Sequence, residues 1–423
     1  MDTGGTGLRR RLATFALGAV LGMALIPVGA LRAVAATTDG ENGSGPPPLG
    51  GLPMKTVARE TTIRWNDLTS ADAWAKAAID YVAGTNDWMR DYRPDADGTY
   101  RFRPARLETR KFFARAVVEA FAPDEAVDPS ITFGDLDPSS RFYPFANVAV
   151  KLGWMGIDRN GDFGGTEPVS MVYVHRVLVR ALGLTDTAAS IDAMHMADGT
   201  PFRTPKNLGS TMLGMRLGLR YNNTNEAMDV LPRTKLPRAQ VAYSLYRATT
   251  LDSWDVSYLQ AQYADMTLPN MGPGREAIVE WGLRYVGYPY VWGGEWGFKS
   301  PEPGALGGQP IPGFDCSGLT WWLLRANDGG AWNVAPPRPY RGWSLPQRAS
   351  YDMATVGNLS YADLKPDDIM FYDGDGDHTV DHVDTYVGNG WAIDSSSSVG
   401  GVTVMWVGDG WYRDHFVHGR HVV

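Results

Sequence analysis

A pattern that recurs three times between about residues 64 and 251 limits the folds open to this 423-residue chain. Each copy has an Asp near its start, a helical segment, a Gly-containing loop and a second helix with apolar periodicity. We place the copies at residues 60–122, 123–186 and 187–251, the third being the loosest. Repeats of this length bury a shared core by packing on one another, so the pattern predicts an all-α module.

The first 35 residues have the layout of an export signal. Three arginines at 9–11 precede an apolar run at 12–31, and the small-residue segment Ala-Val-Ala follows at 33–35. The run is nearly long enough to span a membrane, so a retained anchor is the alternative. Because Gly and Pro interrupt the run and a cleavage site follows at once, we expect removal of residues 1–35. Residues 36–59 then form a Gly/Pro-rich linker.

Charge separates the repeats from the C-terminal part. Residues 60–250 contain 23 Lys/Arg and 23 Asp/Glu, whereas residues 273–423 contain 10 and 18, which accounts for the net charge of −8. An acidic domain repels phosphate polymers, so nucleic acid is not an expected partner. Residues 252–272 show weak periodicity and end in a Pro/Gly-rich stretch, which predicts a linker between the two parts.

The only cysteine, Cys316, lies at the start of a predicted amphipathic helix. Asp315 precedes it as a predicted N-cap, and the helix dipole at this end favours thiolate over thiol. A lone cysteine is more often a small buried apolar residue. Here its position gives a physical reason for a nucleophile, which needs a base within hydrogen-bond reach.

Among the seven histidines, His382 has the best context for that base. It opens a predicted strand, and Gly-Asn-Gly at 388–390 predicts a hairpin turn. With those three residues as the loop, Asp394 faces Asp384 and lies diagonal to His382 on the same face. Asp394 is therefore placed to orient the imidazole, as the third member of a Cys-His-acid relay. His175, by contrast, lies in an apolar helix and is expected to be structural.

This part of the chain resembles the NlpC/P60 family, the papain-like peptidases of bacterial cell walls. Four motifs carry the resemblance, in the right order: Pro-Tyr-Val-Trp-Gly-Gly (289–294), Asp-Cys-Ser-Gly-Leu (315–319), Leu-Lys-Pro-Asp-Asp (364–368) and His-Val-x-x-Tyr-Val-Gly-Asn-Gly (382–390). The resemblance implies an α+β papain-like domain at residues 273–423.

The same resemblance assigns roles to single residues. It implies Cys316 as nucleophile, with its backbone N–H helping to stabilise the oxyanion, His382 as general base, and Asp394 at a third position that is usually a His. Residues matching the acceptor pocket are Tyr290, Asp315 and Ser317, and Asp315 is expected to hold the free amine of the substrate. The usual substrate is the stem peptide of peptidoglycan, commonly cut between D-glutamate and the diamino acid. No cofactor and no metal ion are expected.

Three features depart from the family pattern. The loop at 295–313 is longer than expected, which affects the rim of the cleft. Asp384 replaces a normally small residue and faces Asp394, so that either one carboxylate stays protonated or a cation lies between them. The acidic segment at 373–377 has the Asp-x-Asp-x-Asp spacing of a calcium loop, but His378 occupies the position of the required glycine, which favours a solvated turn.

The three repeats resemble S-layer homology (SLH) repeats. In that family, three repeats form a unit with pseudo-threefold symmetry that holds secondary polymers of the bacterial cell wall. The Arg that begins the second helix of each repeat contacts anionic groups of the ligand, and Arg110 and Arg238 match that position. The second repeat has Val-Ser at 169–170 instead. A purely structural helical spacer is the alternative.

Together these features predict a secreted, cell-wall-associated peptidoglycan stem-peptide hydrolase, in which the repeats place the enzyme on the wall. Two alternatives remain open. In the first, the C-terminal domain is inactive and the protein is a wall-binding structural component. In the second, the same fold performs acyl transfer or hydrolyses a small amide.

Overall fold

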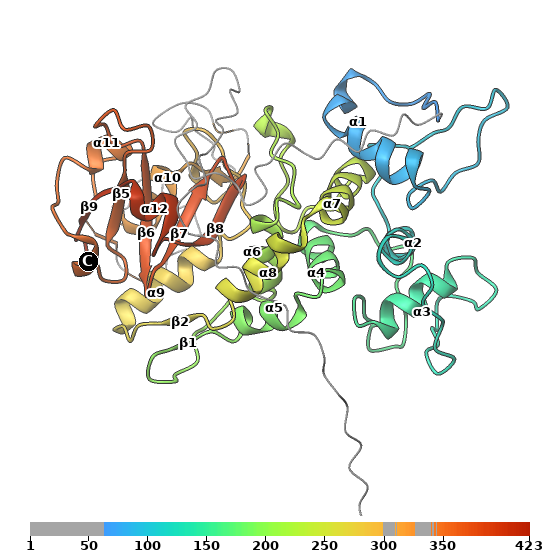
Figure 1. Cartoon of the computed structure of the whole chain (residues 1–423), viewed down its shortest axis with the longest axis horizontal. Coiled ribbons are helices and arrows are strands. Elements are labelled where there is room, and N and C mark those ends of the chain that lie inside the picture. The colour runs from blue at the N-terminus through green and yellow to red at the C-terminus, as the bar shows by residue number, and fades with distance from the viewer. Residues whose placement is uncertain (1–62, 299–308, 310, 326–339, 341, 344) are drawn as a thin grey trace, which may run out of the picture. The chain divides into compact units, whose positions relative to one another are not determined.

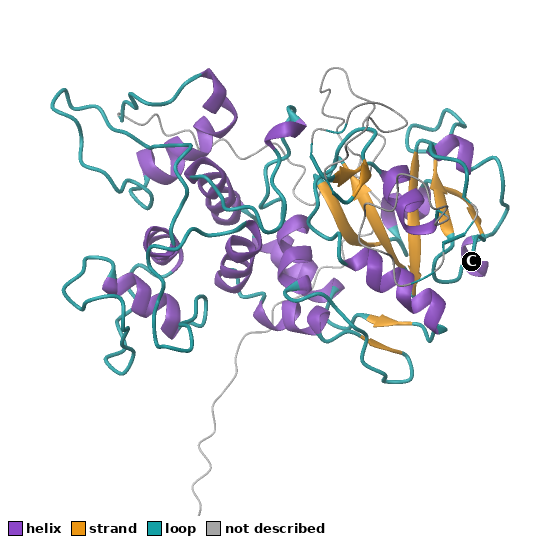
Figure 2. Ribbon diagram, turned by 180° about the vertical axis from the view of Figure 1, so that it is seen from behind, coloured by secondary structure: helices purple, strands orange, loops and turns teal. Residues whose placement is uncertain are grey.

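The computed structural model describes residues 63–298, 309, 311–325, 340, 342–343 and 345–423. The expected export signal and the linker at 36–59 lie outside these residues, as does most of the long loop at 295–313. The described residues contain the helices of the repeat region and a C-terminal sheet (Figure 1; Figure 2). None of the described helices has the length and hydropathy needed to cross a membrane.

Seven α-helices lie among the described residues in the region of the predicted repeats. They are α1 (Ala73–Ile79), α2 (Arg110–Phe121), α3 (Tyr143–Lys151), α4 (Met171–Ala181), α5 (Thr185–Asp192), α6 (Leu208–Arg216) and α7 (Arg238–Thr250). Each predicted repeat thus contains a pair of longer helices: α1 with α2, α3 with α4, and α6 with α7. The apolar positions that define the helical period are also the buried ones.

The segments that lead into α2, α4 and α7 are joined in a closed ring of backbone hydrogen bonds. The N–H of Glu108 donates to the carbonyl of Leu236 (2.9 Å), that of Leu236 to Val169 (2.9 Å), and that of Val169 back to Glu108 (3.0 Å). Each segment therefore satisfies the backbone groups of its neighbour, in the manner of a threefold arrangement.

The Asp near the start of the first two repeats closes the loop that precedes the second helix. Asp67 accepts hydrogen bonds of 2.9 and 2.7 Å from the N–H groups of residues 102 and 103. Asp135 accepts bonds of 2.6 and 2.9 Å from those of residues 163 and 164. The Asp recurs because its carboxylate accepts hydrogen bonds from N–H groups of these loops that would otherwise lack a partner.

Residues 252–272 contain regular structure where a linker was predicted. They form α8 (Ser253–Gln262) and β2 (Thr267–Leu268), and β2 pairs in parallel with β1 (His195–Met196). A capping box between Asp252 and Asp255 begins α8. The helix was missed because few of its residues are buried, which leaves almost no apolar periodicity to detect.

The C-terminal part combines helices with one five-stranded antiparallel sheet, in agreement with the predicted α+β class. Its helices are α9 (Pro273–Leu283), α10 (Cys316–Leu324), α11 (Ser350–Met353) and α12 (Gly410–Asp414). The sheet has the order β8-β7-β6-β5-β9, from β5 (Ile369–Tyr372), β6 (His382–Gly388), β7 (Trp391–Ser396), β8 (Gly401–Trp406) and β9 (Phe416–Arg420); β3 (Glu295–Trp296) and β4 (Gly313–Phe314) pair separately. Helix α10 packs on β6, where the Thr320 and Thr385 hydroxyls lie 3.4 Å apart.

The hairpin between β6 and β7 has the predicted register at Thr385 and Tyr386, but Gly388, predicted to lie in the loop, is paired. Thr385 faces Ile393 and Tyr386 faces Ala392, and a bulge then brings Gly388 opposite Trp391. The turn itself uses Asn389 and Gly390 at φ values of 51° and 83°, a left-handed conformation that these two residue types tolerate best. This register decides which side chains share a face with His382.

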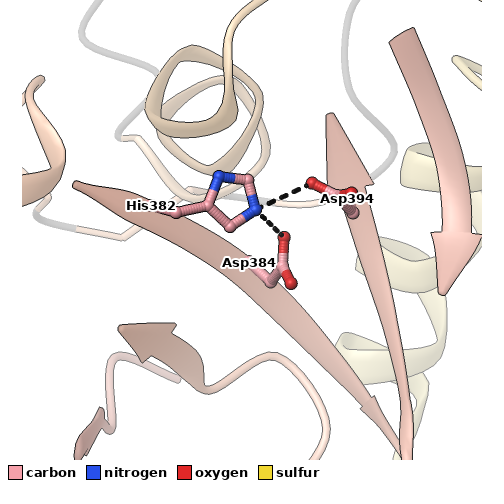
Figure 3. A group of neighbouring side chains, drawn as sticks. All are labelled: His382, Asp384 and Asp394. Atoms are coloured by element: carbon pink, nitrogen blue, oxygen red, sulfur yellow. Dashed lines mark ion pairs between the residues drawn. The ribbon is translucent and has the colours of Figure 1, made fainter. Parts of the chain in front are cut away.

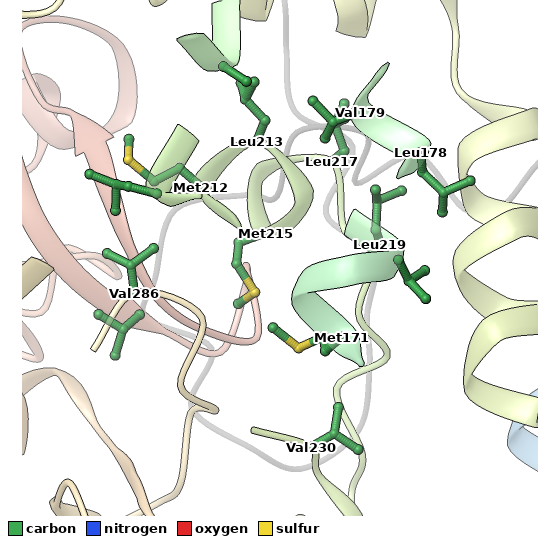
Figure 4. Packing of buried hydrophobic residues seen from close by; sticks show 14 of the residues in the cluster. Met171, Leu178, Val179, Met212, Leu213, Met215, Leu217, Leu219, Val230 and Val286 are labelled. Carbon is green, nitrogen blue, oxygen red and sulfur yellow. The ribbon is translucent and has the colours of Figure 1, made fainter. Parts of the chain in front are cut away.

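The repeats and the C-terminal part share one hydrophobic core within residues 43–423, which form one compact unit. Figure 4 shows Met171, Met212 and Met215 of the repeats in the same cluster as Val286, which follows α9. Next to it, a Cβ on Gly287 would lie 2.8 Å from the Thr211 side chain, so only glycine fits there. The repeats and the C-terminal part are therefore packed against each other and are not separate domains joined by a linker.

One buried side chain in this core makes stability depend on pH. His175 on α4 is fully buried, and burial together with the nearby positive charge of Arg220 lowers its pKa to about 3. The unfolded chain takes up this proton below about pH 6.5 and the folded chain does not, so stability falls as the pH falls from 6.5 toward 3. We expect the free energy of unfolding to drop by up to about 1.4 kcal/mol per pH unit between pH 6 and 4 from this group. Urea unfolding of wild type and His175→Leu should show a smaller drop in the variant; equal slopes would contradict this origin.

Candidate active site

Cys316 is the first residue of α10 and is 9% exposed, and it is a free cysteine. The predicted N-cap is present: Asp315 Oδ1 accepts a hydrogen bond of 2.5 Å from the N–H of Gly318 and one of 3.1 Å from the Ser317 hydroxyl. These bonds fix the first turn of the helix and thus the position of the thiol.

Arg348 also contacts this turn, and sequence reasoning missed it. Its Nη1 donates to the Ser317 hydroxyl (2.7 Å) and lies 3.2 Å from Asp315 Oδ1, while its Nε donates to Glu295 Oε2 (2.6 Å). The carboxylate of Asp315 therefore already has a cationic partner, which competes with the expected role of holding a substrate amine. No predicted motif contains Arg348, so the sequence carried no signal for this contact.

The hydroxyl of Tyr290 is close enough to Cys316 and to Asp394 for the charges of both to act on it. Burial raises the pKa of its hydroxyl, and the negative charges of Cys316, Asp315, Glu226 and Asp394 raise it further. This hydroxyl is thus within electrostatic range of both Cys316 and Asp394, two residues that lie on different elements.

A hydrogen bond between β7 and the segment before α10 holds these elements together. Ser395, the neighbour of Asp394, donates from its hydroxyl to the carbonyl of Phe314 (2.8 Å), two residues before Cys316. The start of α10 and the end of β7 are therefore fixed side by side, with the catalytic candidates on both.

His382, Asp384 and Asp394 form a buried cluster on β6 and β7 (Figure 3). The imidazole Nε2 lies 3.1 Å from Asp394 Oδ1 and 3.3 Å from Asp384 Oδ1, and the three residues are at most 3% exposed. The Tyr412 hydroxyl donates to Asp394 Oδ2 (2.9 Å) and so anchors that carboxylate. Figure 3 shows the second ring nitrogen, Nδ1, on the side of the ring away from the carboxylates, where it is left for another partner.

Charges within this cluster shift the pKa of each member. Burial lowers the pKa of His382, but the adjacent carboxylates raise it by more, so it lies well above its usual value. Burial and the charge of Asp394 raise the pKa of Asp384 to about 8. Burial also acts to raise the pKa of Asp394, yet the positive charge of His382 and the hydrogen bond from Tyr412 bring it below its usual value. Asp394 is therefore the ionised partner of the imidazole.

Two groups of described residues have donor atoms close enough to hold a metal ion: the cluster of His382, Asp384 and Asp394, and an acidic turn formed by Asp373, Asp375 and Asp377. In the acidic turn, Asp373 accepts hydrogen bonds from the N–H groups of Gly376 (2.7 Å) and His378 (2.9 Å). His378 adopts a φ of 71°, as the glycine of a calcium loop would. Both carboxylate oxygens of Asp373 are thus engaged by the backbone of the turn.

The two arginines expected to bind a wall polymer differ in accessibility. Arg110 lines an open cavity of about 480 Å³, where it meets Arg176 and Arg180. Arg238 is 1% exposed and forms ion pairs with Asp91 (2.9 Å) and Glu108 (2.8 Å). Its guanidinium is turned into the core, so this placement does not agree with the expected ligand contact. The sequence could not distinguish the two, since both begin a helix after an extended residue.

Because Arg238 is buried in ion pairs, we expect it to contribute to the stability of the fold. Replacing Arg238 with Ala leaves the buried Glu108 without its cation and leaves Asp91 with Arg115 as its remaining partner, and we expect a loss of about 3–5 kcal/mol in the free energy of unfolding. The matched control is Arg101→Ala, which breaks a largely exposed pair with Asp95 and should cost far less stability, because solvent screens that pair. Urea unfolding of both variants checks this; equal costs would contradict the burial argument.

Comparison with known proteins finds similarity in the C-terminal part of the chain. Residues 287–421 match the model of the NlpC/P60 family. These C-terminal residues are therefore similar to the NlpC/P60 family. The match includes the first turn of α10, the cluster on β6 and β7, and all four sequence motifs from Tyr290 onward.

Two curated relatives illustrate the NlpC/P60 domain. The chain is 29% identical over 143 residues to the bifunctional muramidase/DL-endopeptidase CwlT of Bacillus subtilis, covering 34% of this chain and 35% of that protein. It is 34% identical over 120 residues to the peptidoglycan endopeptidase RipB of Mycobacterium tuberculosis, covering 28% and 42%. The solved structure of RipB is 25% identical, with a TM-score of 0.24 over 39% of this chain and 77% of that one. The chain thus spans less than half the length of these two curated relatives.

Proposed function

We propose that this protein is a cysteine endopeptidase that hydrolyses an amide bond in the stem peptides of peptidoglycan. The observation that carries the proposal is the imidazole of His382, held by Asp394 at 3.1 Å on the sheet against which α10 presents Cys316. The names of the relatives, CwlT and RipB, support the substrate class.

In the proposed reaction, the Cys316 thiol gives its proton to His382 Nδ1 and its sulfur attacks the carbonyl carbon of the scissile amide. Asp394 accepts a hydrogen bond from the Nε2–H of the ring. In this way it fixes the tautomer and stabilises the imidazolium that forms. The backbone N–H of Cys316 stabilises the oxyanion. His382 then protonates the leaving amine, and water hydrolyses the thioester.

We propose that the residues around the first turn of α10 bind the substrate. We infer that Tyr290 and Ser317 shape the acceptor pocket and that Asp315 acts there together with Arg348, which neutralises it. The bond between D-glutamate and the diamino acid is the proposed cleavage point, in line with the DL-endopeptidase in the name of CwlT.

Mass spectrometry of purified muropeptides incubated with the full chain tests this function. New fragments with wild type, and none with Cys316→Ala, are expected, and their masses identify the bond. The absence of fragments from wild type on every muropeptide would overturn the proposal.

We further propose that the repeats are SLH-like and hold the secreted enzyme on a secondary polymer of the cell wall. The ring of hydrogen bonds before α2, α4 and α7 supports a threefold unit. The cavity at Arg110 combines three arginines with four carboxylates, Asp135, Asp158, Asp162 and Glu167. A neighbouring cavity of about 610 Å³ shares Arg176 and adds Lys206, Arg233 and Arg284, with no acidic residue among the described residues that line it, which suits an anionic polymer.

Retention on isolated cell walls tests this attachment. Arg110→Gln should reduce the retained fraction, whereas Arg101→Gln, with the same change of charge outside both cavities, should not. Equal retention of wild type and Arg110→Gln would overturn the role of Arg110.

A further inference from the structure

The cluster of His382, Asp384 and Asp394 contains the groups needed for a second state, in which the proposed enzyme is inhibited. Asp384 is the unusual member, because it adds a second carboxylate beside the relay and is fully buried. Neither of its oxygens makes a hydrogen bond of good geometry to any described residue, and the same holds for His382 Nε2 and Asp394 Oδ1. Four buried polar atoms thus face one another without a well-directed donor, which is costly unless a charge lies between them.

The distances in the cluster match those around a tetrahedral cation. Metal–ligand bonds of about 2.0–2.1 Å place neighbouring ligands of Zn²⁺ about 3.3 Å apart. The observed separations from Nε2 are 3.1 Å to Asp394 and 3.3 Å to Asp384, and all three donor atoms lie within 4.8 Å of one another. Figure 3 shows both carboxylates on the side to which Nε2 points.

We propose that His382, Asp384 and Asp394 bind a divalent transition-metal cation of the Zn²⁺ type, which switches the peptidase off while it is bound. Imidazole nitrogen and carboxylate oxygen are both ligands of Zn²⁺, and three protein ligands with an open fourth position are typical of catalytic zinc sites, whereas Ca²⁺ takes six or more oxygen ligands. The ligands stand on two paired strands, and the Tyr412 hydroxyl holds Asp394 from outside. The inhibitory consequence rests on the proposed function; the metal binding does not.

The inhibition follows from the chemistry of imidazole. To bind the cation, Nε2 must release its proton to solvent, and the remaining ring proton of neutral His382 then sits on Nδ1. In that tautomer Nδ1 has no lone pair to accept the proton of Cys316. The cation and the catalytic tautomer therefore exclude each other.

Thermal unfolding with added ZnCl₂, after removal of metals with a chelator, tests the site without measuring activity. Zn²⁺ should raise the melting temperature of wild type, and CaCl₂ and MgCl₂ should not. In Asp384→Asn the affinity derived from the shift should fall by at least about tenfold, the smaller of the losses known even for outer partners of a metal site. Asp394→Asn should show the same loss. An unchanged wild-type melting temperature on adding ZnCl₂, or shifts in both variants as large as the wild-type shift, would overturn the proposal.

Two control variants test whether a shift in melting temperature comes from zinc bound at another site. Asp375→Asn makes the same chemical change in the exposed acidic turn and should keep the full response. Cys316→Ala should also keep it; loss of the shift there would mean that the thiol binds zinc and would overturn the assignment. Muropeptide cleavage by wild type, halted by ZnCl₂ and restored by chelator, is the expected result for inhibition. If wild type shows the shift but cleaves no muropeptide, the proposed function fails and the metal site stands.

Discussion

Replacing Cys316 with Ala is expected to lower kcat for muropeptide cleavage by about 10⁴–10⁶-fold, because no other described thiol can form the covalent intermediate. Substrate binding should change little, since Tyr290, Ser317 and Arg348 remain in place. Initial rates from quantified fragments, with wild type and variant at equal concentration, measure the loss. The small change in side-chain volume should leave the fold intact.

A matched variant makes this result specific. Cys316→Ser keeps the shape and an oxygen nucleophile, which His382 is not arranged to activate as well, so its kcat should also fall far below wild type. Melting temperatures of both variants close to that of wild type are required for the interpretation. Cleavage by Cys316→Ala at a tenth or more of the wild-type rate would contradict a role as nucleophile.

The second large effect is expected at Asp394. Asp394→Asn removes the ionised partner of His382, so the ring loses the group that fixes its tautomer and stabilises its charge. By analogy with the loss of the acid in other relays, kcat should fall by about 10²–10⁴-fold. Tyr412→Phe removes only the hydrogen bond to Asp394 Oδ2 and should cost far less, about tenfold or below.

The ranking of these variants distinguishes the two carboxylates near His382. Full activity in Asp394→Asn would show that Asp384, 3.3 Å from Nε2, orients the ring instead. An equal loss in Tyr412→Phe and Asp394→Asn would show that the site depends on the packing of α12 rather than on the charge of the carboxylate.

The hairpin that carries the relay was predictable because its signals are local. Gly-Asn-Gly at 388–390 fixes the turn, and the period of two in a strand then determines which residues face each other. The prediction that Asp394 lies near His382 needed nothing else. The bulge that brings Gly388 opposite Trp391 was not predicted, because it depends on packing across the turn.

Contacts that depend on distant chain segments could not be predicted. Arg348 reaches Asp315 and Glu295 from a segment without a motif, and only the fold brings them together. Arg238 was expected to face a ligand, but Asp91 and Glu108, which pair with it, lie 147 and 130 residues away along the chain. Propensity and spacing describe a helix start, but they do not tell which way a long side chain turns.

The most direct test of the central claim is to trap the thioester on Cys316. The full chain is mixed with a muropeptide, quenched in acid within the first turnover, and digested for mass spectrometry. The account predicts that the peptide containing Cys316 gains the mass of the acyl half of the substrate, and that this adduct disappears as products accumulate. Product formation with Cys316 unmodified at every time point, and unaltered cleavage by Cys316→Ala, would contradict it.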